Sequence, residues 1–113
     1  RRTGGDMSFS LDDLAALIKT RRYENASKSY TKSLFDAGAP RIAKKFGEEA
    51  VEAVIAAMGD DRKELTMEAA DVLYHLLVLL EAKDIALAEV VQELARRTSQ
   101  SGLAEKAARG AGS

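Results

Sequence analysis

Residues 65–80 read LTMEAADVLYHLLVLL, and this stretch decides the fold class. It ends in a nearly apolar run of nine residues, Val72 to Leu80, which His75 interrupts. The apolar side chains of the run point to every side of a helix, so such a helix has to be covered all round. Because crossing a bilayer takes roughly 20 apolar residues, the run predicts a buried core helix and no membrane span.

The rest of the sequence also favours helices. Its 113 residues include one proline and eight glycines, and good helix formers dominate the segments between them. Ser10 and Asp61 are suitable N-caps, and Gly38 and Gly59 are suitable C-terminal stops. We therefore predict an all-α fold, a bundle of four to five helices over residues 11–23, 29–37, 40–58, 61–83 and 87–97, with a further turn or two expected in 102–109.

The long apolar helix needs more cover than a chain of this size provides. We expect a second copy of the chain to pack against it, so that dimerisation completes the bundle and the protein is a homodimer. A monomeric bundle with this helix at its centre is the alternative. Within the chain, we expect the last helix to bury four apolar residues, Leu87, Val90, Val91 and Leu94.

Charge and composition exclude several classes of function. The 17 basic residues against 18 acidic ones give a net charge of −1, which excludes a broad basic surface for nucleic acid. The absence of cysteine excludes disulfides, thiolate catalysis and zinc sites that use cysteine. Since no apolar stretch is typical of a signal peptide or a membrane segment, we expect a cytoplasmic protein with no membrane partner.

The chain predicts one domain, over residues 7–109. It is too short for a second, nucleotide-binding domain. Residues 1–6 precede Met7 and are interpreted as a candidate cloning remnant, and the small residues 110–113 are interpreted as a flexible tail.

Three carboxylates share one stripe of the third predicted helix. At about 100° per residue, Glu48, Glu49 and Glu52 fall within about 100° of one another, beside an apolar face. Arg41 and Lys45 fall on the same stripe, one and two turns earlier. The stripe therefore combines acidic and basic side chains.

A second acidic stripe follows on the next helix. Glu64, Glu68, Asp71 and His75 fall within about 60° of each other. A short turn makes the two helices antiparallel neighbours, so the stripes meet. Clustered carboxylates repel one another unless a proton or a cation neutralises them, and all-oxygen ligands suit Mg²⁺ or Mn²⁺. The alternatives at this point are a divalent metal site and a solvated acidic face.

His75 is the only histidine in the chain. It is either a core residue hydrogen-bonded to a neighbour, such as one of those carboxylates, or a direct catalytic residue. A ferritin-like di-iron site needs two ExxH motifs, and the sequence contains none.

Cations precede the acidic motif. The hydroxyl groups of Ser29 and Thr31, at the start of a predicted helix, add candidate ligands for a phosphate. The alternative is that the cations only solvate the surface, which is the interpretation we favour for Lys44. The five cations are Lys28, Lys32, Arg41, Lys44 and Lys45.

Several blocks of the sequence resemble those of phosphoribosyl-ATP pyrophosphohydrolase, a family of the all-α, MazG-like nucleotide pyrophosphatase superfamily. The superfamily signature EExxE followed by ExxD stands at residues 48–52 and 68–71. The resemblance covers nearly the whole chain, in the blocks SYTKSLFDAG (29–38), KKFGEEAVEAVIAA (44–57), LTMEAADVLYHLLVLL (65–80) and QSGLAEKAAR (100–109).

This resemblance implies an enzyme that hydrolyses phosphoribosyl-ATP to phosphoribosyl-AMP and pyrophosphate, the second step of histidine biosynthesis. It implies Mg²⁺ as cofactor, with Mn²⁺ as a substitute, and a dimer whose active sites draw on both chains. Association with the next enzyme of the pathway, phosphoribosyl-AMP cyclohydrolase, stays open.

The resemblance also assigns roles to residues. Water activated by the metal would attack the α-phosphate, with Glu48 and Glu49 as the catalytic residues, Glu48 orienting or deprotonating that water. Two further sets follow. The expected metal ligands are Glu49, Glu52, Glu68 and Asp71, and the expected substrate-binding residues are Ser29, Thr31, Lys32, Arg41 and Lys45.

Two other functions are weighed against this one. A house-cleaning pyrophosphatase that acts on ordinary nucleoside triphosphates would use the same acidic motif, because that motif handles only the triphosphate. Arg22, Lys28 and Lys32 are where we expect the second phosphate of phosphoribosyl-ATP to be recognised. The other alternative is a helical dimerisation module without catalytic activity.

Overall fold

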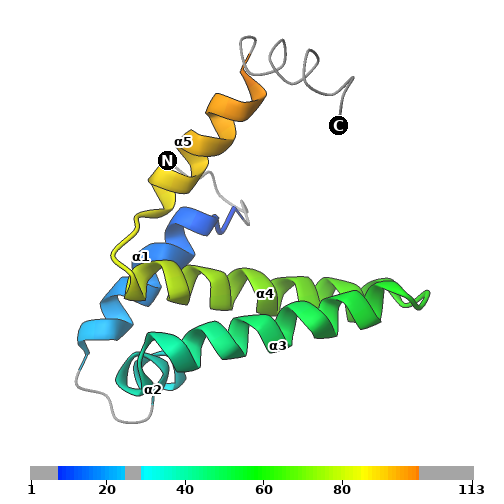
Figure 1. Ribbon diagram of the computed structural model, residues 1–113, viewed down its shortest axis with the longest axis horizontal. Coiled ribbons are helices and arrows are strands. Elements are labelled where there is room, and N and C mark those ends of the chain that lie inside the picture. The colour runs from blue at the N-terminus through cyan, green and yellow to red at the C-terminus, as the bar shows by residue number, and fades with distance from the viewer. Residues whose placement is uncertain (1–7, 25–28, 100–113) are drawn as a thin grey trace.

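The computed structural model describes residues 8–24 and 29–99, and in these residues the chain forms five α-helices and no strand (Figure 1). The prediction of an all-α fold with four or five helices is confirmed. The expectations for residues 1–6, 102–109 and 110–113 concern parts of the chain outside the described residues. The helices are α1 (Leu11–Tyr23), α2 (Tyr30–Ala37), α3 (Ala39–Ala57), α4 (Arg62–Ala82) and α5 (Leu87–Thr98).

Polar caps set where the helices begin. Ser10 Oγ accepts a hydrogen bond from the Asp13 amide at 3.0 Å, and Asp13 Oδ2 accepts one from the Ser10 amide at 3.1 Å, which is a capping box. Asp61 Oδ1 accepts from the Glu64 amide at 3.1 Å at the start of α4. Both predicted N-caps are confirmed. Gly38, with φ at 96°, ends α2 and leads directly into α3.

The long helices α3 and α4 form an antiparallel pair, and α1 and α2 lie at one end of it (Figure 1). We call this end, which includes the start of α3 and the last half of α4, the closed end. The core lies there, and the helix that the sequence singles out supplies two of its members. The core residues are Ile18, Leu34, Ile42, Leu77 and Val78.

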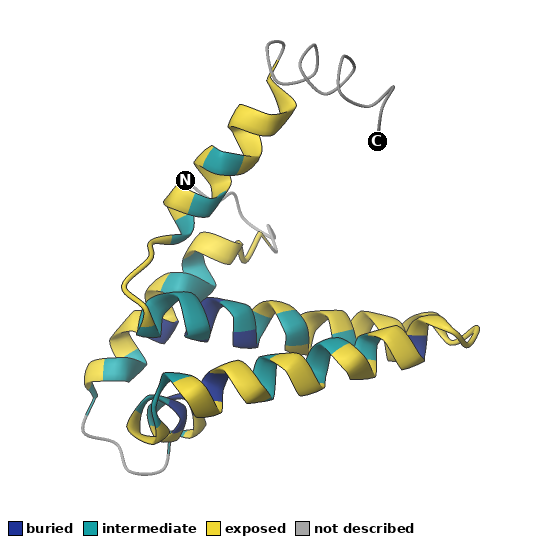
Figure 2. Cartoon of the chain, in the orientation of Figure 1, coloured by how far each residue is buried: buried dark blue, intermediate teal, exposed yellow. Residues whose placement is uncertain are grey.

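The opposite end of the α3–α4 pair, residues 50–70, is the open end. Its helices are largely exposed in Figure 2. Val54 and Ile55 are each 61% exposed and Met58 is 79% exposed. Among the described residues of this end, only Ala56 is buried. The open end therefore presents an apolar face that the described residues do not cover.

Helix α5 departs from the sequence-based expectation. None of its residues is buried, and Val91 and Leu94 are about half exposed, so the prediction that this helix buries four apolar residues is wrong for the described part of the chain, although Leu87 is partly buried against the core. The cause is the turn before it. Asp84 adopts a positive φ of 59°, and the Ile85 amide donates to the Leu80 carbonyl at 2.9 Å, as in a Schellman motif. This turn directs α5 away from the bundle (Figure 1).

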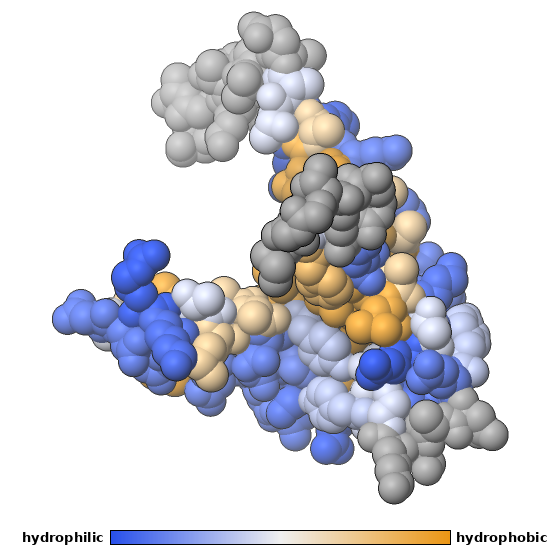
Figure 3. All heavy atoms as spheres, turned by 180° about the vertical axis from the view of Figure 1, so that it is seen from behind, coloured by the Kyte–Doolittle hydropathy of each residue, from blue (hydrophilic) through white to orange (hydrophobic). Residues whose placement is uncertain are grey.

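A hydrophobic surface lies where α5 leaves the bundle (Figure 3). Seen from behind in Figure 3, hydrophobic residues gather where α5 leaves the bundle and continue along α5. Among the described residues, no helix combines the length and the hydropathy that crossing a membrane requires.

Candidate active site

Three carboxylates from the two long helices converge where the closed end meets the open end. One oxygen each of Glu49 on α3 and of Glu68 and Asp71 on α4 can be chosen so that all three lie within 4.8 Å of one another. We call these residues the acidic trio. The residues come together because α3 and α4 run side by side, so that one stripe of each helix faces the other.

The acidic trio is an electrostatically strained group. Partial burial raises the pKa of the Glu68 carboxyl, and the negative charges of Asp71, Glu52 and Glu49 raise it further. One cation touches the trio in the described part of the chain, since Lys45 Nζ lies 3.5 Å from Glu49 Oε2. Such a site favours a bound cation or a proton.

The structure separates the other two acidic candidates from the trio. Glu52 is exposed and lies near enough to raise the pKa of Glu68, yet it is not one of the three converging carboxylates. Glu48 is also exposed and faces a neighbouring groove instead. The four expected metal ligands and the expected base therefore divide into the trio, one nearby carboxylate and one groove residue.

That groove runs between α2 and α3 and has a volume of about 450 Å³. We call it the basic groove, since three cations and one carboxylate are its charged members. Its polar lining consists of Tyr30, Ser33, Arg41, Lys44, Lys45 and Glu48. The basic groove adjoins the acidic trio through Lys45, which lines the groove and pairs with Glu49.

His75 links the basic groove to the acidic trio, because it bonds to Tyr30 of the groove lining and to the main chain of Asp71. It is 4% exposed; its Nδ1 lies 2.8 Å from the Asp71 main-chain oxygen and its Nε2 lies 3.0 Å from the Tyr30 hydroxyl. A carbonyl can only accept, so Nδ1 carries a proton that it donates to Asp71, and Nε2 shares a hydrogen bond with the Tyr30 hydroxyl. The histidine is thus a core residue bonded to a neighbour, although its acceptor is a main-chain oxygen and not a carboxylate.

The remaining predicted phosphate ligands have partners within the chain. Ser29 Oγ accepts from the Lys32 amide and caps α2, and the Lys32 ammonium lies 2.6 Å from Asp36. Thr31 is buried, and its hydroxyl bonds to that of Tyr74. Lys28 lies outside the described residues. The structure therefore gives Ser29, Thr31 and Lys32 local roles and leaves Arg41 and Lys45 in the groove.

Arg22 lines neither the basic groove nor the acidic trio. Its guanidinium donates to the Glu81 main-chain oxygen at 2.8 Å and to the Glu81 carboxylate at 2.9 Å, and it lies 3.3 Å from Asp84. These bonds tie α1 to the end of α4, and they raise the pKa of Arg22. The expectation that Arg22 meets a substrate phosphate does not fit a side chain already engaged in this way.

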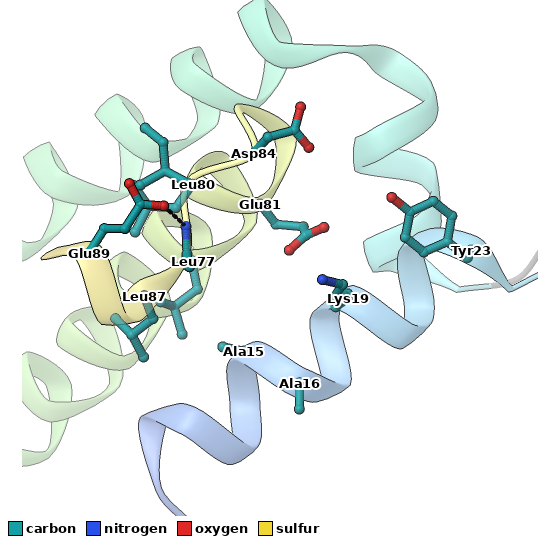
Figure 4. Close-up of a pocket in the computed structure, with 12 residues that line it drawn as sticks. Ala15, Ala16, Lys19, Tyr23, Leu77, Leu80, Glu81, Asp84, Leu87 and Glu89 are labelled. Carbon is teal, nitrogen blue, oxygen red and sulfur yellow. Dashed lines mark hydrogen bonds between the residues drawn. The ribbon is translucent and has the colours of Figure 1, made fainter. Parts of the chain in front are cut away.

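A second hollow, of about 340 Å³, lies between α1, the end of α4 and the start of α5. Figure 4 shows Lys19 of α1 and Glu81 of α4 pointing toward one another across it. Leu77, Leu80 and Glu81, which line this hollow, follow Asp71 by six to ten residues along α4, and Leu80 projects from the side of the helix opposite to Asp71. This hollow is therefore separate from the acidic trio, and none of the predicted site residues lines it.

Comparisons with known proteins bear on this geometry. Residues 11–98, from the first residue of α1 to the last of α5, match the family described as Phosphoribosyl-ATP pyrophosphohydrolase. The chain belongs to the phosphoribosyl-ATP pyrophosphohydrolase family. The acidic trio and the basic groove both lie within the part shared with that family, and the resemblance stated from the sequence is confirmed.

Named relatives agree over most of their length. The phosphoribosyl-ATP pyrophosphatase of Agrobacterium fabrum is 57% identical over 102 residues, which are 90% of this chain and 95% of that protein. That of Sinorhizobium medicae is 56% identical over 101 residues, 89% of this chain and 94% of the relative. That of Rhodobacter capsulatus is 54% identical over 89% of this chain and 98% of its own. The comparisons thus support this family over the two alternatives.

What the sequence could not find was the link between the groove and the trio. The bond from Tyr30 to His75 requires α2 to lie against α4, which depends on tertiary packing and not on spacing along one helix. The sequence favours a surface position for Lys44, and in the structure this residue is exposed and also lines the basic groove, which spacing alone does not show. Its position one residue before Lys45, in a stretch dense in cations, was the available signal.

Proposed function

We propose that this protein hydrolyses phosphoribosyl-ATP to phosphoribosyl-AMP and pyrophosphate in histidine biosynthesis. The observation that carries the proposal is the convergence of Glu49, Glu68 and Asp71 beside a groove with three cations, in a chain of this family. Water attacks the α-phosphorus, the bond to the β-phosphate oxygen breaks, and pyrophosphate leaves. Because histidine biosynthesis takes place in the cytoplasm, we expect the protein there.

The donor set of the acidic trio fits a divalent cation. Three carboxylates supply only oxygen ligands, which Mg²⁺ and Mn²⁺ prefer. Partial burial, and then the neighbouring carboxylates, raise the pKa of Glu68, and a bound cation would relieve the repulsion among these groups. Glu49, Glu68 and Asp71, with Glu52 nearby, would hold the ion. When bound, it would supply charge neutralisation for the triphosphate and acidify water beside the α-phosphate.

The protein's own groups do the rest. Lys45 lies between the trio and the groove, where its ammonium can neutralise phosphate charge without leaving Glu49. Glu48 follows on the same stripe of α3, is exposed, and makes no ion pair with any described residue. It is therefore free to accept a proton from the attacking water. The Glu48→Gln variant should bind substrate and lose most of its turnover.

A homodimer is the second part of the proposal. The described residues leave apolar side chains of the open end and of α5 exposed, and exposed apolar side chains that gather on one face favour a protein interface. The acidic trio borders the open end, so a partner that covers it would also approach the site. Light scattering should give twice the chain mass. A monomer at micromolar concentration would contradict the dimer.

The test of the activity is pyrophosphate release. The protein is incubated with phosphoribosyl-ATP, ATP or deoxynucleoside triphosphates, each with Mg²⁺ and with EDTA. Release from phosphoribosyl-ATP that EDTA abolishes is the expected result. Release from the ordinary triphosphates at an equal rate would contradict the proposed substrate and favour a house-cleaning enzyme, and no release at all would contradict the activity.

A further inference from the structure

Two cations of the basic groove have no ion-pair partner among the described residues. Arg41 and Lys44 make no ion pair with any described residue, whereas Lys45 pairs with Glu49 and Lys32 pairs with Asp36. Both unpaired cations lie on one side of α3, about one turn apart, and line the same groove. Like charges placed this close repel each other, so an anion between them would be stabilised.

Arg41 and Lys44 lie on the same helix, α3, as Glu49 of the acidic trio, so their distance from the trio along the helix axis follows from helix geometry. Arg41 precedes Glu49 by eight residues and Lys44 precedes it by five. At 1.5 Å per residue, the two cations lie about 12 and about 8 Å along α3 from the trio. An anion held by Arg41 and Lys44 therefore lies well apart from a group held at the trio.

Phosphoribosyl-ATP has two phosphate-bearing ends, the triphosphate and the 5-phosphate of the added ribose, with the adenosine portion between them. Under the proposed function the triphosphate reacts at the trio, so the ribose phosphate must be held elsewhere. We infer that the Arg41–Lys44 part of the basic groove binds this second phosphate and so selects phosphoribosyl-ATP over ATP. The inference rests on the proposed function for the identity of the ligand.

The chemistry of the groove suits a phosphate monoester. Arginine presents a planar fork that can donate two parallel hydrogen bonds to phosphate oxygens, and lysine adds a compact positive charge. Glu48 is the one carboxylate in the lining, so the groove keeps an excess of positive charge. The inference also moves recognition of this phosphate away from Arg22 and Lys32, which already have partners in the chain.

The test compares two nucleotides that differ only by the ribose phosphate arm. Calorimetry measures the binding of phosphoribosyl-AMP and of AMP to the wild type, to the double variant Arg41→Gln/Lys44→Gln and to the control Lys63→Gln. Lys63 is exposed at the open end and lines none of the pockets described here. We expect the double variant to bind phosphoribosyl-AMP about tenfold more weakly or worse, and to bind AMP as the wild type does. The control should match the wild type for both.

Other outcomes separate the two proposals, since binding needs no turnover. A wild type that binds phosphoribosyl-AMP no better than AMP would overturn the inference, as would a double variant that weakens both nucleotides equally or neither. Failure of the wild type to release pyrophosphate would instead overturn the proposed function. Circular dichroism of the variants confirms that the helices are retained, and the single variants Arg41→Gln and Lys44→Gln replace the double one if it does not fold.

Discussion

The closed end and the open end use the same two long helices, yet among the described residues only the closed end buries large apolar side chains. Ile42 of α3 and Val78 of α4 are fully buried where α1 and α2 pack on the pair. About two and a half to three and a half turns further along α3, Val51, Val54 and Ile55 are more than half exposed. The same helix is thus a core element at one end and an uncovered surface at the other.

This difference teaches where a chain of this size places its stability and its chemistry. Burial at the closed end orders α3 and α4 relative to each other, and that order brings the acidic trio together. The trio lies where the burial stops, so its carboxylates are held by a packed scaffold and yet face a region that a ligand or a second copy can reach. The closed end therefore orders the helices, and the open end leaves space for a ligand or a second copy of the chain.

The largest expected effect comes from removing a carboxylate at the boundary. Asp71→Asn and Glu49→Gln each keep the size of the side chain and remove one charged ligand. We expect turnover to fall by more than about a hundredfold, because the loss of even a supporting group at a metal site costs 10- to 100-fold. Pyrophosphate release with Mg²⁺ measures the loss, and circular dichroism should show unchanged helix content.

The matched control for these variants is Asp60→Asn, in the turn between α3 and α4. Asp60 is exposed and is not one of the converging carboxylates. Its turnover should equal that of the wild type. An Asp71→Asn enzyme that keeps full Mg²⁺-dependent activity would remove Asp71 from the site.

The second prediction compares the two ends directly. Ile42→Ala, in the core of the closed end, should lower the free energy of unfolding by about 2–5 kcal/mol through lost burial and a cavity. Val54→Ala, on the exposed face of the open end, should cost less than about 0.5 kcal/mol in a dilute, monomeric chain. Urea denaturation measures both. If Ile42→Ala does not fold, Ile42→Val should cost about 0.5–1.5 kcal/mol.

Protein concentration sharpens this comparison. If a second copy covers the open end, the cost of Val54→Ala should grow as concentration rises, because dimerisation adds to stability by mass action. The cost of Ile42→Ala contains no such partner term. Equal costs for the two substitutions at every concentration would contradict the division into two ends.

Much of the fold could be predicted because local signals coincide with the structure. Ser10 and Asp61 are polar residues that directly precede segments with helical spacing of apolar residues, and both cap their helices in the structure. Gly38 stands between two helices at a position with a positive φ. The path of α5 could not be predicted. Its apolar period shows that it has a face to cover, and not whether that face meets its own bundle.

The site could be predicted only in part, for a related reason. Spacing along one helix placed Glu68 and Asp71 on one stripe, and the turn at 58–61 brought Glu49 opposite to them. Spacing also places Glu48 on one stripe with Glu49. The two residues lie about 100° apart around α3, however, and Glu48 faces the basic groove instead of the trio. The partners of Arg22 lie 59 or more positions along the chain, beyond any local pattern.

Arg22 provides the third prediction, which separates structural from ligand-binding cations. Its side chain is 24% exposed and bonds to both the main chain and the side chain of Glu81. Arg22→Gln should lower the free energy of unfolding by about 1–3 kcal/mol, because it leaves a partly buried carboxylate without its partner. Thermal denaturation measures the change in stability. KM for phosphoribosyl-ATP should stay within twofold of the wild-type value, which corresponds to a difference in binding free energy of less than about 0.4 kcal/mol.

The neighbouring residue is its control. Arg21 pairs with Glu24 at 3.9 Å, and both side chains are more than 40% exposed, so Arg21→Gln should change stability little. A rise in KM for Arg22→Gln without any loss of stability would return Arg22 to the list of phosphate ligands.

The smallest expected effect concerns α5, which contacts the core through Leu87 at its start and has further along its length a set of local bonds. Arg96 Nη2 lies 2.7 Å and Arg97 Nε 2.9 Å from Glu93 Oε2, and these hydrogen bonds lower the pKa of Glu93 from 4.5 to about 2. Since the folded pKa is the lower one, the contribution to stability is full above pH 4.5 and is lost as pH falls toward 2. Amide exchange in α5 should therefore rise over this window in the wild type, and the rise should be smaller in Glu93→Gln, which has no carboxylate to titrate. Identical pH profiles for the two proteins would show that α5 is held by a partner surface instead of by these bonds.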